Sequence, residues 1–213
     1  MTDHRSFIIL DKLFMAIIVD KDKKRRDIAI ACTELLLEKG LKNLTVAEIA
    51  KTAGIGKGTV YEYFSKKEDV VYEIIRNLMA EHQQDIASRT DSNTSTRQKV
   101  FYLMDFLLQE DKDYSKHLET YKEFVSITLS DSNADEMHQF NAECNSFMKS
   151  MLTDIINEGI EKNEIIPESK NLIGGIMISE SGAMLRAWLT NTDTKKEFKN
   201  YINTLFNLIE IKK

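Results

Sequence analysis

The chain has 213 residues, more than a typical single domain, so it has room for two hydrophobic cores. One proline, eight glycines and 42% hydrophobic residues exclude a many-turn β protein and favour long helices. The net charge is −5, yet residues 23–67 hold ten Lys or Arg against five Asp or Glu, so a patch that attracts phosphate is confined to that segment.

The chain begins with an apolar run from Phe7 to Val19 that is interrupted by Asp11 and Lys12. This run is too short to cross a bilayer of ~30 Å, and it lacks the clean apolar core and cleavage site of a secretory signal. We therefore expect a cytoplasmic protein with no membrane segment, and assign residues 1–22 to an N-terminal extension. Three interpretations stay open for it: a helix packed on the next domain, which we favour, a flexible arm, or an over-long start with Met15 as initiator.

The first predicted helix of the next domain runs from Lys24 to Lys39, and Gly40 ends it. The basic run from Lys23 to Arg26 is either a solvated face or a contact to phosphate. The apolar stripe of this helix consists of Ile28, Cys32, Leu35 and Leu36.

Two short helices joined by a glycine turn are predicted next. Thr45 and Glu48 have the spacing of a capping box at the start of the first short helix. Gly54 falls where the chain must leave that helix through a left-handed conformation, which favours glycine. Two apolar stripes then meet across the turn. Their members are Val46, Ile49, Ala50, Ala53, Ile55, Val60 and Phe64.

The second short helix leaves a polar, partly basic face outward. A hydroxyl, an ammonium group and a helix start suit phosphate oxygens, while a phenol ring can touch a thymine methyl or a base edge. The sequence SKKE from Ser65 to Glu68 predicts a second capping box and a further helix. The outward residues are Lys57, Gly58, Thr59, Tyr61, Glu62 and Tyr63.

The run TVAEIAKTAGIGKGTVYEYFSKKEDV, from Thr45 to Val70, resembles the signature of the TetR (TetR/AcrR) family of bacterial transcription regulators. Family members usually have Ser or Asn where this chain has Lys66, so the cap is expected to shift to Ser65. The resemblance implies an all-α protein with a three-helix, helix-turn-helix DNA-binding domain at residues 23–70 and a helical ligand-binding and dimerisation domain at 71–213. It also implies DNA-backbone contacts from Thr45, Lys57, Thr59, Tyr63 and Lys67, with Gly58 and Tyr61 nearest the bases.

The helix that starts at Lys66 is long enough to belong to both domains, and a polar break from Ser88 to Ser95 ends it. Pro167 fits a first-turn or pre-helix position, whereas Gly159 is a possible terminator inside a long predicted helix. The other helices are predicted at Thr96–Glu110, Tyr114–Leu129, Ala134–Glu161, Glu168–Asn191 and Thr194–Ile211.

The last two predicted helices suggest self-association. In the TetR family such a C-terminal pair typically forms a four-helix dimer interface, and a two-fold dimer would read two half-sites of a palindromic operator. The alternative is that these faces only complete the core of the monomer. The proposed interface combines a small-residue face (Gly174, Gly175, Ser179, Gly182, Ala183 and Ala187) with an apolar stripe (Phe198, Ile202, Leu205 and Ile209).

The resemblance further implies a pocket for an unidentified small molecule in the C-terminal domain. Each candidate can equally be ordinary core, because Phe and Met at helical spacing are what packing needs. The candidate lining residues are Phe106, Phe124, Phe147, Met148, Met151 and Trp188, with His117 and Tyr121 as polar groups.

No catalytic, cofactor or metal site is expected. GKGT from Gly56 to Thr59 lacks the earlier glycine of a phosphate-binding loop, and its lysine is followed by Gly58 rather than Ser or Thr. The region from Asp131 onward begins like a calcium loop but has Glu136 at the turn glycine. The four histidines lack zinc spacing, and two cysteines are too few for a metal cluster, so Cys32 is expected to be a buried free thiol.

These observations and the resemblance together predict a dimeric, sequence-specific transcription regulator whose affinity for double-stranded operator DNA changes when a small molecule binds. The resemblance favours a repressor, and an activator stays the alternative. The rival hypothesis is a non-sequence-specific architectural DNA-binding protein that uses the same basic patch. An enzyme is not favoured, because we find no convergent set of titratable groups in the sequence.

Overall fold

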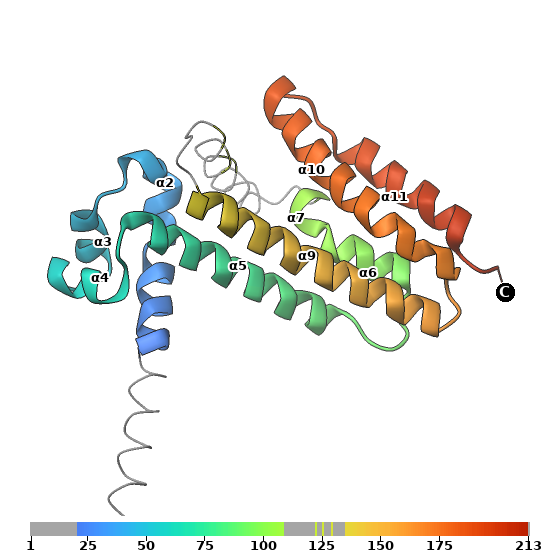
Figure 1. Cartoon of the computed structure of the whole chain (residues 1–213), viewed down its shortest axis with the longest axis horizontal. Coiled ribbons are helices and arrows are strands. Elements are labelled where there is room, and N and C mark those ends of the chain that lie inside the picture. The colour runs from blue at the N-terminus through green and yellow to red at the C-terminus, as the bar shows by residue number, and fades with distance from the viewer. Residues whose placement is uncertain (1–20, 109–121, 123–124, 126–128, 130–134, 213) are drawn as a thin grey trace, which may run out of the picture. The chain divides into compact units, whose positions relative to one another are not determined.

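The computed structural model describes residues 21–108, 122, 125, 129 and 135–212 (Figure 1). The described residues are almost entirely helical, and the β feature among them is an isolated bridge between Ile165 and Glu210. The all-α prediction is therefore confirmed. The N-terminal run from Phe7 to Val19, with Met15, and most of the helix expected at Tyr114–Leu129 lie outside the described residues.

The chain divides into two compact units, Met1–Ala80 and Glu81–Lys213. The boundary falls within the long helix α5 (Lys67–Arg89), which the sequence predicted as a helix belonging to both domains. None of the described helices is long and apolar enough to cross a membrane.

The described part of the first unit starts with helical residues 21–31, one turn residue at Cys32, and α2 (Thr33–Asn43). The predicted helix from Lys24 to Lys39 is confirmed, and Gly40 has the positive φ of 73° that lets the chain leave the helix. The short helices α3 (Val46–Thr52) and α4 (Lys57–Tyr63) follow, and then α5 begins.

The core of the first unit is formed by the stripes that the sequence predicted. Ile28, Cys32 and Leu36 recur at helical spacing and are each at most 2% exposed. Ile49, Val60 and Phe64 are equally buried and pack α3 and α4 onto this core. Cys32 is buried and free, as predicted, and burial raises the pKa of its thiol to about 11.

In the second unit the predicted helix Thr96–Glu110 is broken. The helix α6 (Thr96–Leu103) ends at Met104, whose backbone leaves helical values, and the single turn α7 (Asp105–Leu108) follows. The predicted helix Ala134–Glu161 is confirmed as α9 (Asp135–Glu161).

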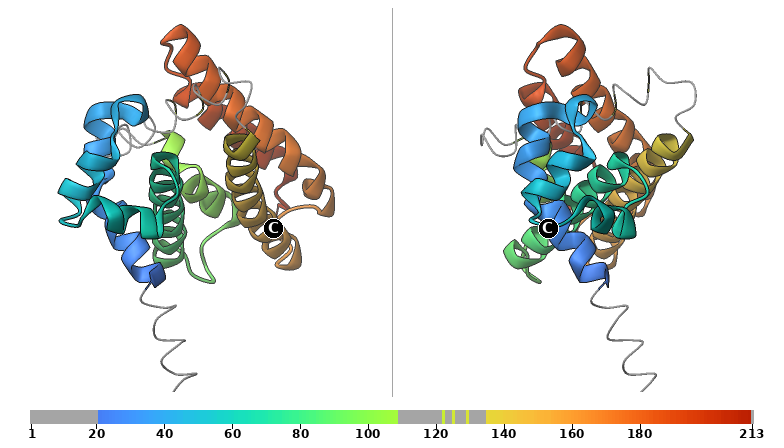
Figure 2. Two further views of the ribbon diagram at one scale, coloured as in Figure 1. Left: turned by 60° about the vertical axis from the view of Figure 1, so that its left-hand side comes forward. Right: turned by 90° about the vertical axis from the view of Figure 1, so that its left-hand side faces the viewer.

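The predicted helix Glu168–Asn191 begins as a 3₁₀ segment, η1 (Pro167–Leu172), and only then continues as α10 (Ile173–Thr190). Pro167 occupies the first position of η1, as predicted, and Asn191 ends α10 in a left-handed conformation. The last helix is α11 (Lys195–Ile209), and Figures 1 and 2 show it side by side with α10.

Gly159 does not end α9, so its interpretation as an early terminator is wrong. It lies inside the helix where α9 packs on the start of α6. A Cβ atom built on Gly159 would lie 2.7 Å from Cγ2 of Thr96 and closer still to Oγ1. Glycine is therefore required here by the close approach of the two helices. Thr96 is held in place because its backbone N–H and its hydroxyl both donate to the Glu164 carboxylate, each at 2.7 Å.

The apolar stripe of α11 faces the core of its own unit, which corrects part of the predicted dimer surface. Phe198, Ile202 and Ile209 are at most 6% exposed and belong to the main hydrophobic cluster of the second unit, and Leu205 packs against it. The reason is that α11 needs this face to cover the other helices of the unit. For α11, the alternative that the stripe completes the monomer core is confirmed.

Candidate functional site

The helix α3 starts with the predicted capping box. The Thr45 hydroxyl accepts a hydrogen bond from the backbone N–H of Glu48, and the Glu48 carboxylate accepts one from the backbone N–H of Thr45 at 3.1 Å. Lys39 pairs with the same carboxylate, and this contact, together with the Thr45 hydroxyl, lowers the pKa of Glu48. Thr45 is exposed, but its hydroxyl is already engaged in the cap.

The turn between α3 and α4 is closed by two backbone hydrogen bonds of the Schellman type. The N–H of Ile55 donates to the carbonyl of Ala50 at 2.9 Å, and the N–H of Gly54 donates to that of Lys51 at 3.3 Å. Gly54 has a φ of 65°, so the left-handed residue predicted from the sequence is present. The turn fixes the direction in which α4 leaves α3.

The helix α4 is anchored by its inner face and presents its outer face to solvent. Val60, inside the helix, and Phe64, just after it, are at most 2% exposed, whereas the Tyr61 side chain is 59% exposed. Lys57 and Gly58 are exposed as well, and Thr59 and Tyr63 are half-buried beside them. The structure therefore brings the five candidate residues of α4 together on one short helix.

Gly58 differs from Gly54 and Gly159 in what surrounds it. It lies in the first turn of α4 without a positive φ, and a Cβ atom built on it would meet nothing within 4 Å. The fold of the chain therefore does not require glycine at this position, although glycine disfavours a helix relative to alanine by roughly 0.5–1 kcal/mol.

Lys67 was expected to contact the DNA backbone, and in the structure its side chain contacts the end of α2. Its ammonium group donates to the carbonyl oxygens of Leu41 at 2.9 Å and of Lys42 at 3.1 Å, at the end of α2. A cation at the carboxyl end of a helix is favourable, so Lys67 helps to hold α2. An ammonium group has three donors, and two of them are used in this way.

The predicted second capping box is replaced by a different one. The structure starts α5 at Lys67, and the carboxylate of Asp69 accepts hydrogen bonds from the backbone N–H groups of Ser65 at 2.9 Å and Lys66 at 3.2 Å. The Lys66 side chain has no acceptor to offer at the helix start. The acceptor therefore comes from Asp69, three residues further on, and not from Glu68.

Arg25 belongs to the basic run that was expected to be a solvated face or a phosphate contact, and in the described structure its side chain is part-buried against its own unit. Its guanidinium donates to the carbonyl of Tyr63 at 2.5 Å and to the carboxylate of Glu73 at 2.9 Å, and it lies 4.5 Å from the centre of the Phe64 ring. Arg25 thus fixes the end of α4 against α5. The sequence did carry a signal, because Arg25 precedes Ile28 and Cys32 at helical spacing on the buried stripe.

The family model described as bacterial regulatory proteins, tetR family, matches residues 30–74, which contain the whole helix-turn-helix unit. The fatty acid metabolism regulator protein of Bacillus subtilis is 26% identical over 148 residues, which cover 68% of this chain and 72% of the relative. The HTH-type transcriptional repressor KstR2 of Rhodococcus jostii is 25% identical over 149 residues, 68% of this chain and 71% of that protein.

Solved structures agree at the level of the fold. A TetR transcription regulator from Haloarcula marismortui superposes with a TM-score of 0.67 at 18% identity, covering 89% of this chain and all of that one. A TetR-family regulator from Cytophaga hutchinsonii gives 0.66 at 20% identity, covering 91% and 98%.

Residues 30–74 of the chain match the DNA-binding domain of the TetR family. The chain is a sequence-specific DNA-binding regulator of transcription, and α3, the Gly54 turn and α4 form its helix-turn-helix. The family assignment and the general function predicted from the sequence are both confirmed.

Only some of the candidate ligand residues lie together at the main hydrophobic cluster of the second unit. Phe106, Met148, Met151 and Trp188 are half-buried and pack against the main cluster of the second unit. Phe147 is half-buried but is not part of that cluster. His117, Tyr121 and Phe124 lie outside the described residues.

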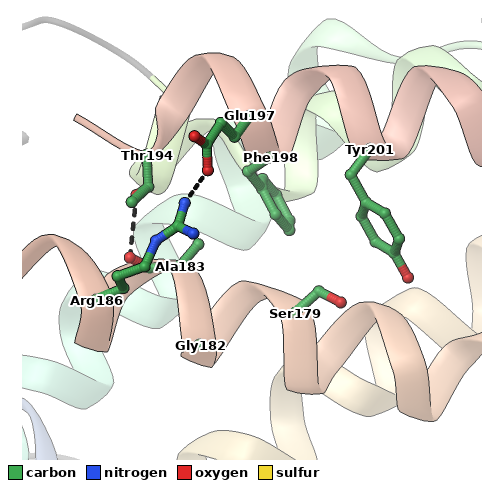
Figure 3. Close-up of a pocket in the computed structure, with 8 residues that line it drawn as sticks. All are labelled: Ser179, Gly182, Ala183, Arg186, Thr194, Glu197, Phe198 and Tyr201. Carbon is green, nitrogen blue, oxygen red and sulfur yellow. Dashed lines mark hydrogen bonds and ion pairs between the residues drawn. The ribbon is translucent and has the colours of Figure 1, made fainter. Parts of the chain in front are cut away.

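A described pocket of about 260 Å³ lies elsewhere, between α10 and α11 (Figure 3). Arg186 and Glu197 form an ion pair across it, Thr194 donates to the carbonyl of Ala183, and Phe198 and Tyr201 project from α11. None of the predicted ligand residues lines this pocket.

The sequence reasoning missed Glu180, which lies on the buried face of α10 and is only 5% exposed. Its side chain is flanked on the same face by Met177 and Met184. A carboxylate placed at helical spacing within an apolar stripe is a signal that the sequence alone could have supplied.

Proposed function

We infer that this TetR-family regulator is a ligand-responsive repressor that binds a palindromic operator as a dimer, in the cytoplasm. The observation that carries the DNA half of this proposal is the outer face of α4. There an exposed tyrosine follows a glycine that the fold does not need. A bare backbone at Gly58 allows a duplex to approach α4 closely, and the ring of Tyr61 extends far enough to reach base edges in the major groove.

The other candidate residues are proposed to position α4 on the duplex. Lys57 and Thr59 at the start of α4 suit phosphate oxygens, and Tyr63 can reach the backbone from its end. Thr45 and Lys67 are proposed as further backbone contacts. Thr45 would contact a phosphate oxygen by turning its hydroxyl away from the Glu48 carboxylate, because that carboxylate accepts from both of its donors in the described structure. Lys67 would use its third donor while the other two hold α2.

The proposed dimer rests on the outer face of α10 and α11. Five large apolar residues are exposed there, three of them at 74–76%. Cβ atoms built on Gly174 and Gly182 would meet nothing within 4 Å, so the chain itself does not need glycine at either position. An apolar face with small residues is what a second copy requires for close helix packing. The exposed apolar residues are Ile178, Leu185, Leu189, Tyr201 and Leu208.

The ligand-responsive half of the proposal follows from the dimer. Two α4 helices held at a fixed spacing bind two half-sites at once, and a ligand that favours another spacing lowers the population that fits the operator. The ligand-binding part is assigned to the second unit, where half-buried Phe106, Met148, Met151 and Trp188 surround the core.

The proposed roles are tested by selecting bound genomic DNA fragments with the purified protein and then comparing selected with scrambled duplex. We expect Tyr61→Ala to weaken binding to the selected duplex by about 1–3 kcal/mol and to leave scrambled DNA nearly unchanged. Lys57→Ala is the matched comparison: it should weaken both duplexes alike and reduce the salt dependence by about one phosphate contact. An equal loss on both duplexes for Tyr61→Ala would instead support the architectural alternative.

A further inference from the structure

Glu180 is the one charged residue among the buried side chains that the structure describes. It lies on the face of α10 that Ile173, Ile176, Met177 and Met184 also occupy, and these four residues belong to the hydrophobic cluster of the second unit. Helical spacing therefore directs the carboxylate into the core and away from the outer face proposed for the dimer.

The chain offers this carboxylate little compensation for its burial. Its hydrogen bond within the described structure comes from the hydroxyl of the neighbouring Ser181, at 2.9 Å. Burial raises the pKa of Glu180 to about 7, and the Ser181 hydroxyl opposes this rise only in part. Of the other buried hydroxyls of the second unit, those of Thr96 and Thr194 donate to acceptors of the chain itself, whereas that of Ser169 has no hydrogen-bond partner among the described residues. A buried carboxylate without a cation is costly, so Glu180 is left with an unused capacity to bind one.

The surroundings of Glu180 can give way to a ligand. Met177 and Met184 flank it on α10, and Met148 and Met151 of α9 pack against the same cluster. Since α10 packs on α9, these four methionines belong to one helix pair. Methionine side chains are unbranched and adaptable, so they can rearrange around an apolar body. One carboxylate in a deformable apolar setting has the composition of a small-molecule site.

We propose that Glu180 is the polar anchor of the effector site of this regulator, and that the effector is an amphipathic organic cation, with an ammonium group that pairs with Glu180 and an apolar body that lies among the methionines. This inference rests on the proposed ligand-responsive function and names the chemical class of its ligand. Binding of the cation stabilises the ionised carboxylate, so the protein releases a proton to solvent as it binds an amine that is already protonated.

Three probes with one apolar body test the proposal: n-octylammonium, n-octanol and octanoate, titrated calorimetrically into the full-length protein. We expect octylammonium to bind at least about tenfold more tightly than octanol, and octanoate to bind most weakly. The affinity for octylammonium should rise by roughly tenfold from pH 6 to pH 8 as Glu180 ionises. The heat of octylammonium binding should depend on the buffer, because the protein releases a proton.

The variant Glu180→Gln keeps the shape of the side chain and removes its charge. We expect this variant to lose the preference for octylammonium and its pH dependence, while octanol binding stays the same. Glu168→Gln, at an exposed carboxylate in η1, is the control and should bind all three probes like the wild type. Thermal unfolding confirms that each variant is folded before it is titrated.

The proposal is overturned if the wild type binds octylammonium no better than octanol, or does not bind octylammonium at millimolar concentration. It is also overturned if the wild type and Glu180→Gln bind octylammonium equally well. Operator binding measured with and without the probe separates this inference from the proposed function. Charge-selective binding through Glu180 that leaves DNA affinity unchanged supports the cation site and contradicts ligand-responsive regulation. A loss of DNA affinity that persists in Glu180→Gln supports regulation and contradicts the cation site.

Discussion

Gly54 and Gly58 lie four residues apart in the helix-turn-helix, and the structure gives them different reasons to be glycine. Gly54 has a φ of 65°, where a side chain strains the backbone even though the space around it is open. Gly58 lies in helical backbone with open space, so the folded chain tolerates a side chain there. The first glycine serves the turn, and the second is available for an external partner.

The two glycines are therefore expected to respond oppositely to alanine. Gly54→Ala should lower the free energy of unfolding by about 1 kcal/mol or more, because alanine must adopt the left-handed conformation. Gly58→Ala should leave stability unchanged or raise it by up to about 1 kcal/mol, yet weaken operator binding. Urea unfolding and fluorescence anisotropy on selected DNA measure the two effects. Full operator affinity in Gly58→Ala would show that α4 does not approach the duplex at this residue.

The burial of Glu180 predicts how the stability of the protein depends on pH, independently of any ligand. Its pKa is raised in the folded state to about 7 from an ordinary value of 4.5, so the folded state holds a proton that the unfolded chain has already lost. The stabilisation from this proton is complete below pH 4.5 and is lost as the pH rises through 7. Relative to Glu180→Gln, the free energy of unfolding of the wild type should fall by roughly 3 kcal/mol between these pH values and should not fall further above pH 8. Urea titrations of both proteins from pH 5 to pH 8.5 measure the difference, and parallel pH profiles would contradict the burial of an ionisable carboxyl group.

At the scale of elements, features encoded within a few residues could be predicted from the sequence. The Thr45–Glu48 capping box, the Gly54 turn and the stop at Gly40 each depend on neighbours in the chain, and all three are present. The 3₁₀ start of the α10 segment and the break at Met104 were missed, because helical periodicity does not distinguish a tight turn from an α-helical one.

Features that depend on packing between distant segments could not be predicted in the same way. Arg25 contacts the carbonyl of Tyr63, 38 residues away, and Thr96 contacts Glu164, 68 residues away. Nothing local in the sequence pairs these residues. For the same reason Gly159 resembled a helix terminator, whereas the structure explains it by the closeness of α6 to α9.

The contact between α6 and α9 predicts a strong coupling between Gly159 and Thr96. Gly159→Ala should lower the free energy of unfolding by about 1–3 kcal/mol, because the new methyl group overlaps the Thr96 side chain. Much of the destabilisation caused by Gly159→Ala should disappear in a Thr96→Ala background, which lacks Oγ1 and Cγ2, the two atoms closest to the new methyl group. A double-mutant cycle by urea unfolding measures the coupling, and additive losses would mean that the helices are further apart than the structure places them.

At the scale of the whole molecule, two surfaces of different chemistry belong to different units. The basic excess of residues 23–67 belongs to the unit with the helix-turn-helix, and the exposed apolar residues of α10 and α11 belong to the other. The basic segment lies in the first unit, and Gly174, Gly175 and Gly182 of the small-residue face of α10 are exposed, so a role of this face in a dimer stays a prediction. The sequence assigned the wrong face of α11 to the proposed dimer, because a stripe at helical spacing does not say whether its partner is the same chain or a second copy.

The proposed dimer predicts that a charge on the outer face of α10 separates the protomers without unfolding them. Ile178 and Leu189 are each 76% exposed, so Ile178→Asp and Leu189→Asp cost the isolated chain little. In a two-fold interface each substitution occurs twice, and every buried, unpaired carboxylate opposes association by several kcal/mol. Sedimentation equilibrium should then show a dimer for the wild type and a monomer for either variant, with unchanged helicity. Ile30→Asp, at an apolar residue 53% exposed in the first unit, should remain dimeric.

On DNA, the monomeric variants should lose affinity for a two-half-site operator but bind a single half-site like the wild type, because their α4 helices are intact. A wild type that is monomeric at micromolar concentration, or an Ile178→Asp variant that still dimerises, would show that this face has another partner.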